Sequence, residues 1–129
     1  GPGVKERFEG ACAVTDAEAS DACTIRDAIA ARLEAVTVDE DTGKDMFLFM
    51  PSTPGAPIAP GSDAEIVESF RNGQLRLTTA AGLARLPQAT VPVPKRDGAP
   101  PLGLSVVGPR GTDEALLRLA GELEKALIE

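Results

Sequence analysis

The stretch that decides the fold runs from residue 102 to residue 117 and reads LGLSVVGPRGTDEALL. Its first six residues, 102–107, are mostly apolar, which is typical of a strand covered on both faces. Gly108 and Pro109 end that strand. Thr112 then offers a helix N-cap, and the two acids after it suit the positive end of a helix dipole. An apolar stripe follows at helical spacing: Leu116, Leu119, Ala120, Leu123 and Leu127. The stretch therefore predicts a buried strand that leads directly into an amphipathic helix.

Three more helices are predicted upstream. The first covers residues 4–14. The second begins at a capping box between Thr15 and Glu18 and continues along an apolar stripe. That stripe consists of Ala22, Ile25, Ile29, Leu33 and Val36. The third follows a second capping box over residues 62–65 and contains Gly73 and Gly82, which indicate either close packing or a break.

Two further strands and the connections complete the pattern. Residues 46–50 form a short apolar run that Pro51 ends, and residues 89–94 form an extended segment whose prolines limit pairing on one side. Residues 39–45 and 51–61 are rich in turn formers and predict loops, and residues 95–101 predict a turn. The order is helix, helix, strand, helix, strand, strand, helix. We therefore expect one α/β region over residues 1–129, with a thin sheet that is incomplete alone.

Composition narrows the classes of function. The chain has 129 residues, 43% of them hydrophobic, which fits one globular domain. Its net charge of −7 would repel phosphate backbones and anionic membranes, so we expect no nucleic-acid partner. We also expect no membrane association, because no apolar run is long enough to cross a bilayer and no secretion signal is recognisable.

The counts of cysteine and histidine are equally informative. Cys12 and Cys23 are too few for a secreted disulfide scaffold, so we expect a cytoplasmic protein in which both are small buried residues on helical faces. The chain has no histidine, which excludes Ser-His-Asp and Cys-His machinery within it. Without histidine or a CxxC pair a zinc site is not expected, and we expect no cofactor.

Several segments resemble motifs of the amidase signature family. The segment from Leu86 to Val93, LPQATVPV, resembles its "GLPxxxxP" strand, with Arg85 where that family usually has glycine. Asp97-Gly98 with residues 101–109 resembles "DGxPxGxQxxGP", with Ser105 at the usual glutamine, and residues 110–117 resemble "xGxDExLL". Residues 1–8 and 50–57 are similar to segments in the same order. The resemblance therefore spans nearly the whole chain.

The resemblance implies a fold and an activity. The expected fold is the C-terminal portion of the amidase-signature mixed sheet, flanked by helices. Members hydrolyse amides with a serine nucleophile, a second serine in a cis peptide and a lysine base, around a Gly-Ser-Ser-Gly segment. That segment is absent here, and no serine of this chain adjoins another: Ser20, Ser52, Ser62, Ser69 and Ser105. We therefore assign no catalytic residue to this chain, and we expect the rest of an amidase domain and a small amide substrate as its partners.

One segment is a candidate for contact with substrate. Ser52, Thr53 and Pro54 leave the end of a predicted strand, where ligands bind in open α/β sheets, and could line the amide pocket. The alternative is a proline-stiffened surface loop. A second interpretation of the whole chain also stays open, namely a non-catalytic amidase-like module for binding or structure. An unpaired sheet edge would in either case favour self-association.

Overall fold

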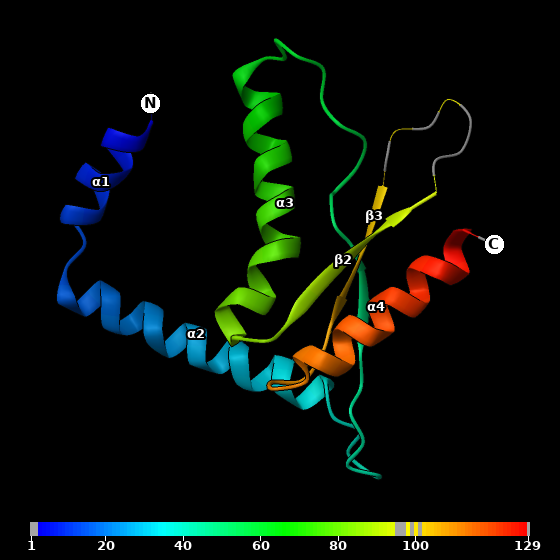
Figure 1. Cartoon of the computed structure of the whole chain (residues 1–129). Helices are drawn as coiled ribbons and strands as arrows, with labels where there is room; N and C mark the ends of the chain where they lie inside the picture. The colour runs from blue at the N-terminus through cyan, green and yellow to red at the C-terminus, as the bar shows by residue number, and fades with distance from the viewer. Residues whose placement is uncertain (1–2, 95–97, 99, 101, 129) are drawn as a thin grey trace.

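The computed structural model describes residues 3–94, 98, 100 and 102–128 (Figure 1). The elements in chain order are α1 (Val4–Cys12), α2 (Asp16–Val36), β1 (Leu48–Pro51), α3 (Ala64–Ala84), β2 (Gln88–Val93), β3 (Leu102–Val107) and α4 (Asp113–Ile128). The α/β class and the predicted order of elements are confirmed. Most of the predicted turn over residues 95–101 lies outside the described residues, as do the motif positions Asp97 and Pro101 and the first two residues of the chain.

The three strands form one sheet in the order β1-β3-β2, and both pairings are antiparallel. Met50, Ser105 and Thr90 lie side by side in one row across it. Within this chain the sheet is therefore antiparallel rather than mixed. Since β1 and β2 both run opposite to β3, their C-terminal ends lie at the same end of the sheet.

Helices cover both faces of the sheet. On one face Val107 joins Ala81, Ala84 and Leu86 in a buried cluster, and Leu33 of α2 packs against it. Residues on the opposite face of the same strands, including Val91 and Val106, are also buried. Helix α4 contacts β2 and β3 and buries Leu116 and Ala120, so it covers this second face. The core is small and aliphatic, as the composition predicts.

Prolines occupy outward positions on both free edges of the sheet. The Ser52 N–H donates to the Gly103 carbonyl at 3.0 Å, and the Gly108 N–H donates to the Pro87 carbonyl at 3.1 Å. Because bonded pairs alternate along an antiparallel ladder, Pro51 of β1 and Pro92 of β2 direct their backbone nitrogens away from β3. Proline has no N–H to donate, so each free edge lacks one hydrogen-bond donor.

Two local predictions about helix starts have different outcomes. The capping box of α2 is confirmed, because the Thr15 N–H donates to Glu18 Oε2 at 2.8 Å and the Glu18 N–H donates to Thr15 Oγ1 at 3.3 Å. The second capping box is wrong. Helix α3 has Asp63 as its N-cap with no side-chain cap bond, and the Ser62 hydroxyl instead donates to the Ala59 carbonyl at 2.7 Å. That bond closes the preceding turn, which takes the hydroxyl away from the helix.

The predicted burial of the cysteines is also wrong. Cys12 lies on α1 and Cys23 on α2, as expected, but both thiols are exposed and free. The reason is that α1 and the first half of α2 extend away from the sheet (Figure 1). All of α1 is exposed, and no residue of α2 is fully buried. The apolar stripe of α2 therefore lacks a partner along most of its length, with Ile25 62% exposed.

The accessible surface of the chain is large for its size. It measures 9438 Å², whereas a self-contained monomer of this mass exposes about 6,500 Å². The difference of about 3,000 Å² on this one chain exceeds the roughly 1,000–2,500 Å² per partner that most obligate protein interfaces bury. Many of the exposed side chains are large and apolar, for example Phe8, Ile25, Phe49 and Ile66. The chain thus leaves a large apolar surface uncovered.

Candidate functional site

Ser52, the first predicted site residue, continues the ladder beyond the end of β1. Besides the backbone bond to Gly103, its hydroxyl donates to the same carbonyl at 3.1 Å, and the side chain is half-buried. A Cβ on Gly103 would overlap Ser52 Oγ and lie 2.9 Å from Thr90 Cγ2. The motif glycine therefore permits close approach of the Ser52 hydroxyl, which fastens the start of the loop to β3.

Thr53 and Pro54 belong to the same short turn. The Thr53 hydroxyl donates to the Gly55 carbonyl at 3.1 Å. Pro54 packs on α3 at Gly73, where an added Cβ would lie 3.0 Å from Pro54 Cβ. Of the two alternatives for Gly73, close packing is therefore correct, and α3 continues unbroken through it. The three predicted residues lie together just beyond the C-terminal end of β1, where Ser52 contacts β3 and Pro54 contacts α3.

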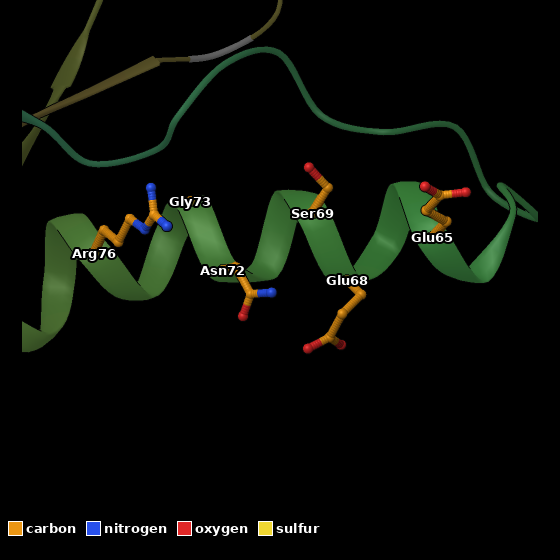
Figure 2. Close-up of a pocket in the computed structure, with 6 residues that line it drawn as sticks. All are labelled: Glu65, Glu68, Ser69, Asn72, Gly73 and Arg76. Carbon is orange, nitrogen blue, oxygen red and sulfur yellow. The ribbon is translucent and has the colours of Figure 1, made fainter.

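A polar groove runs along α3 beside this turn and shares Gly73 with it. Its volume is about 630 Å³. In Figure 2, Ser69 and Arg76 lie on the side of the helix that faces the segment leading into α3, and Glu68 and Asn72 project the other way. Glu68 is also paired with Arg71 at 3.5 Å. The groove offers carboxylates, an amide, a hydroxyl and a guanidinium, which can bind polar groups but do not make the serine–lysine pair that amide hydrolysis by this family requires.

Two partly buried hydrogen bonds stabilise the motif region. The Ser105 side chain is fully buried and forms a hydrogen bond of 2.8 Å with the Thr90 hydroxyl across the sheet. At Gly108, an added Cβ would lie 2.7 Å from Thr112 Oγ1 and 2.8 Å from the Phe47 ring. The Thr112 hydroxyl donates to the Pro109 carbonyl at 2.7 Å. These motif residues therefore hold β3, the following turn and the start of α4 together.

Sequence reasoning missed a group of arginines at the C-terminal end of α3. Arg85 caps the helix in the left-handed conformation, with φ 57° and ψ 37°. Arg110 forms an ion pair with Glu34 of α2 and donates to the Ala84 carbonyl at 3.1 Å. Together with Arg26, both arginines line a hollow of about 180 Å³. The signal was present in the sequence, since Arg85 stands where the resembled motif usually has glycine.

Two exposed carboxylates, Glu18 of α2 and Asp39 in the loop after it, accept local hydrogen bonds. The backbone N–H and hydroxyl of Thr15 donate to the Glu18 carboxylate and lower its pKa. In the same way, the hydroxyl and N–H of Thr42 lower the pKa of Asp39. Both carboxylates are exposed and shape local turns. In the part of the chain that the structure describes, no helix is long and apolar enough to cross a membrane.

Comparison with known proteins gives sequence and fold relatives. No protein-family model matches the chain. The chain is 27% identical over 123 residues to Amidase 1 of Arabidopsis thaliana, a match that covers 95% of this chain and 28% of that protein. It is 33% identical over 101 residues to the A subunit of the mitochondrial glutamyl-tRNA(Gln) amidotransferase of Coccidioides posadasii (strain C735), covering 74% of this chain and 20% of that protein.

The fold is similar to part of a solved structure. The A subunit of glutamyl-tRNA(Gln) amidotransferase from Thermotoga maritima superposes with a TM-score of 0.69 at 23% identity, covering 89% of this chain and 24% of that chain. The three-stranded sheet and its helices thus match a fragment of that amidotransferase fold. The chain spans between a fifth and three tenths of the length of these relatives. In sequence the chain is thus similar to part of an amidase and to part of an amidotransferase A subunit, both proteins of the amidase signature family, and in fold to a fragment of such an A subunit.

Proposed function

We propose that this chain is the C-terminal part of an amidase, an enzyme that hydrolyses the C–N bond of a carboxamide. The observation that carries the proposal is the extent of the matches. Family members align with as much as 95% of this chain, while the chain covers only 28% of the same relative. The order of the strand motifs from residue 86 to residue 117 supports a position late in such a domain.

The large exposed surface supports the same proposal. An excess of about 3,000 Å² over a self-contained monomer agrees with a chain that packs against a large partner surface. The remaining amidase domain is accordingly the partner that we propose. The alternative, a non-catalytic module, would also need a partner, but that partner would not contain the nucleophile.

The chemistry belongs to residues outside this chain. In the proposed enzyme, a serine oxygen attacks the amide carbonyl carbon while the proton of its hydroxyl passes through the second serine to the lysine. The C–N bond then breaks, and the amine leaves with that proton, returned by the same route. Water then hydrolyses the ester, which releases the carboxylic acid and regenerates the serine. The resemblance assigns these roles to a Gly-Ser-Ser-Gly segment and a lysine that precede the region found here.

This chain contributes scaffold and, we propose, one wall of the amide pocket. Ser52 is fastened to β3 through its hydroxyl, so it positions the turn rather than reacting. Thr53 and Pro54 then follow at the end of the sheet where both β1 and β2 terminate. Packing of Pro54 on Gly73 keeps this turn rigid, as a pocket wall must be. We place the protein in the cytoplasm, where its exposed thiols would stay reduced.

The test uses the whole reading frame that contains these residues. The encoded polypeptide is expressed, and release of ammonia or amine is measured from a panel of small carboxamides. We expect turnover that falls at least about a thousandfold when the first serine of the Gly-Ser-Ser-Gly segment is replaced by alanine. The 129-residue chain alone should show none above buffer. A reading frame without such a segment, or turnover by the chain alone that depends on one of its five serines, would contradict the proposal.

A further inference from the structure

A hollow beside β1 is enclosed by apolar side chains alone. It lies between α2, α3 and one face of the sheet and has a volume of about 240 Å³. Side chains from all three sides line it, among them Leu33, Leu48, Met50, Ala80, Leu86 and Val107. None of its lining side chains carries a nitrogen or oxygen atom that could bind a polar ligand. Protein interiors rarely leave apolar space of this size unfilled.

We propose that this hollow receives a bulky apolar side chain from the preceding part of the amidase domain. The inference rests on the proposed function and goes further by naming the place and the chemistry of the contact. The small residues Ala80 and Ala81 of α3 create the space, and the larger residues opposite define its walls. An apolar occupant would restore the packing density of a core there, at no cost in unpaired polar groups.

The neighbouring backbone identifies the occupant as polypeptide. The register with β3 places the Phe49 N–H and carbonyl on the free edge of β1, and Phe49 is one of the residues that line the hollow. A small apolar molecule would bury these groups without hydrogen bonds, whereas a polypeptide segment can bond to them while its side chain enters the hollow. The Phe49 side chain, 52% exposed, lies on the other face of β1, where the same segment could cover it.

The excess surface of the chain agrees with a partner of this size. The hollow accounts for only a small part of the extra area of about 3,000 Å², and the exposed apolar stripe of α2 runs close to it. One continuous partner could therefore cover β1, the hollow and the stripe. The hollow is a point in this surface where a single side chain would have apolar walls on three sides, as the central anchors of interfaces do.

Thiol labelling tests the proposal. Cys12→Ser and Cys23→Ser remove the native thiols, and Ala80→Cys then places one thiol in the hollow. Glu122→Cys, at an exposed charged position of α4, serves as the matched reference, because burying an unpaired carboxylate is unfavourable. A neutral maleimide is reacted with the 129-residue chain and with the polypeptide of the whole reading frame. We expect Cys at 80 to react at least about tenfold more slowly in the longer polypeptide, with the reference unchanged.

The outcomes separate the two proposals. Equal reactivity of the thiol at 80 in both proteins, with amide hydrolysis by the longer one, would overturn the filling of the hollow and leave the function standing. No amide hydrolysis by the longer polypeptide would overturn the function, and the proposed occupant with it. A second variant guards against misfolding: Ala80→Leu should lower the thermal midpoint of the longer polypeptide, because the space is already filled. Thr79→Leu, at an exposed neighbour on α3, should leave that midpoint unchanged.

Discussion

Replacing Gly103 by alanine tests the closest contact of the candidate site. The new Cβ would overlap Ser52 Oγ and lie 2.9 Å from Thr90 Cγ2 and 3.2 Å from Ser52 Cβ. Two adjustments follow. The Ser52 hydroxyl must turn away and lose its bond to the Gly103 carbonyl, at about 1 kcal/mol. Strand β3 must also move from Thr90, and overpacking of this kind costs about 1–3 kcal/mol. The free energy of unfolding should therefore fall by about 2–4 kcal/mol.

Urea unfolding of the purified chain, followed by far-ultraviolet circular dichroism, measures this loss. Gly82→Ala is the matched control, because it makes the same change inside α3 where, apart from the adjacent residues and the nearby backbone of the helix itself, no atom lies within 4 Å of the added methyl group. Alanine is the better helix former, so the control should gain up to about 1 kcal/mol. In a Ser52→Ala background the overlapping oxygen is gone, and Gly103→Ala should cost about 1 kcal/mol less than in the native chain. Equal stability of the Gly103 and Gly82 variants would refute the reasoning.

Three further predictions concern single side chains. Arg85→Gly should raise the free energy of unfolding by about 1 kcal/mol, because glycine adopts the left-handed conformation without strain, while Arg85→Ala should bring no such gain in the same urea titration. Ser105→Ala should lower it by about 1 kcal/mol through loss of the buried bond to Thr90, and a native-like value would contradict that role. The pKa of Glu18 is lower in the folded chain than in the unfolded chain. Glu18 therefore stabilises the fold at a pH above its pKa in the unfolded chain, and this stabilisation is lost as the pH falls through its pKa in the folded chain. A carboxyl-carbon NMR titration should find the Glu18 midpoint below its midpoint in Thr15→Ala, which loses both hydroxyl bonds and keeps the backbone N–H of residue 15 as a donor; identical midpoints would sink this account.

Local signals in the sequence predicted most of the elements. The apolar run over 102–107 became β3 with the same bounds, and the capping box at Thr15 starts α2. The strand after residue 45 begins at Leu48 rather than Met46, because the Met46 N–H donates to the Thr37 carbonyl at 2.8 Å and is drawn to the end of α2. No pattern in the sequence indicates that the Met46 N–H will donate to the end of α2 and not to a neighbouring strand.

The site was less predictable than the fold. Residues 52–54 could be placed after a strand by the prolines, but the role of the Ser52 hydroxyl depends on Gly103, 51 positions away. The left-handed Arg85 was visible only as a departure from a motif, since arginine itself gives no sign of that conformation. Exposure of Cys12 and Cys23 follows from α1 and α2 extending beyond the sheet, which periodicity does not report. Whether Thr53 and Pro54 line a pocket stays a prediction.

If the rest of a domain covers this surface as proposed, the prolines at the sheet edges matter most while the surface is uncovered. Pro51 and Pro92 each remove an outward donor, on the two strands that a neighbouring copy would meet. In a cross-β stack every strand needs an unbroken series of backbone N–H donors. A second copy that paired with either edge would therefore lack one hydrogen bond at the proline. The exposed Phe49 side chain stands next to one of these gaps. The chain thus has a safeguard against fibril growth at the place where its apolar surface would otherwise favour it.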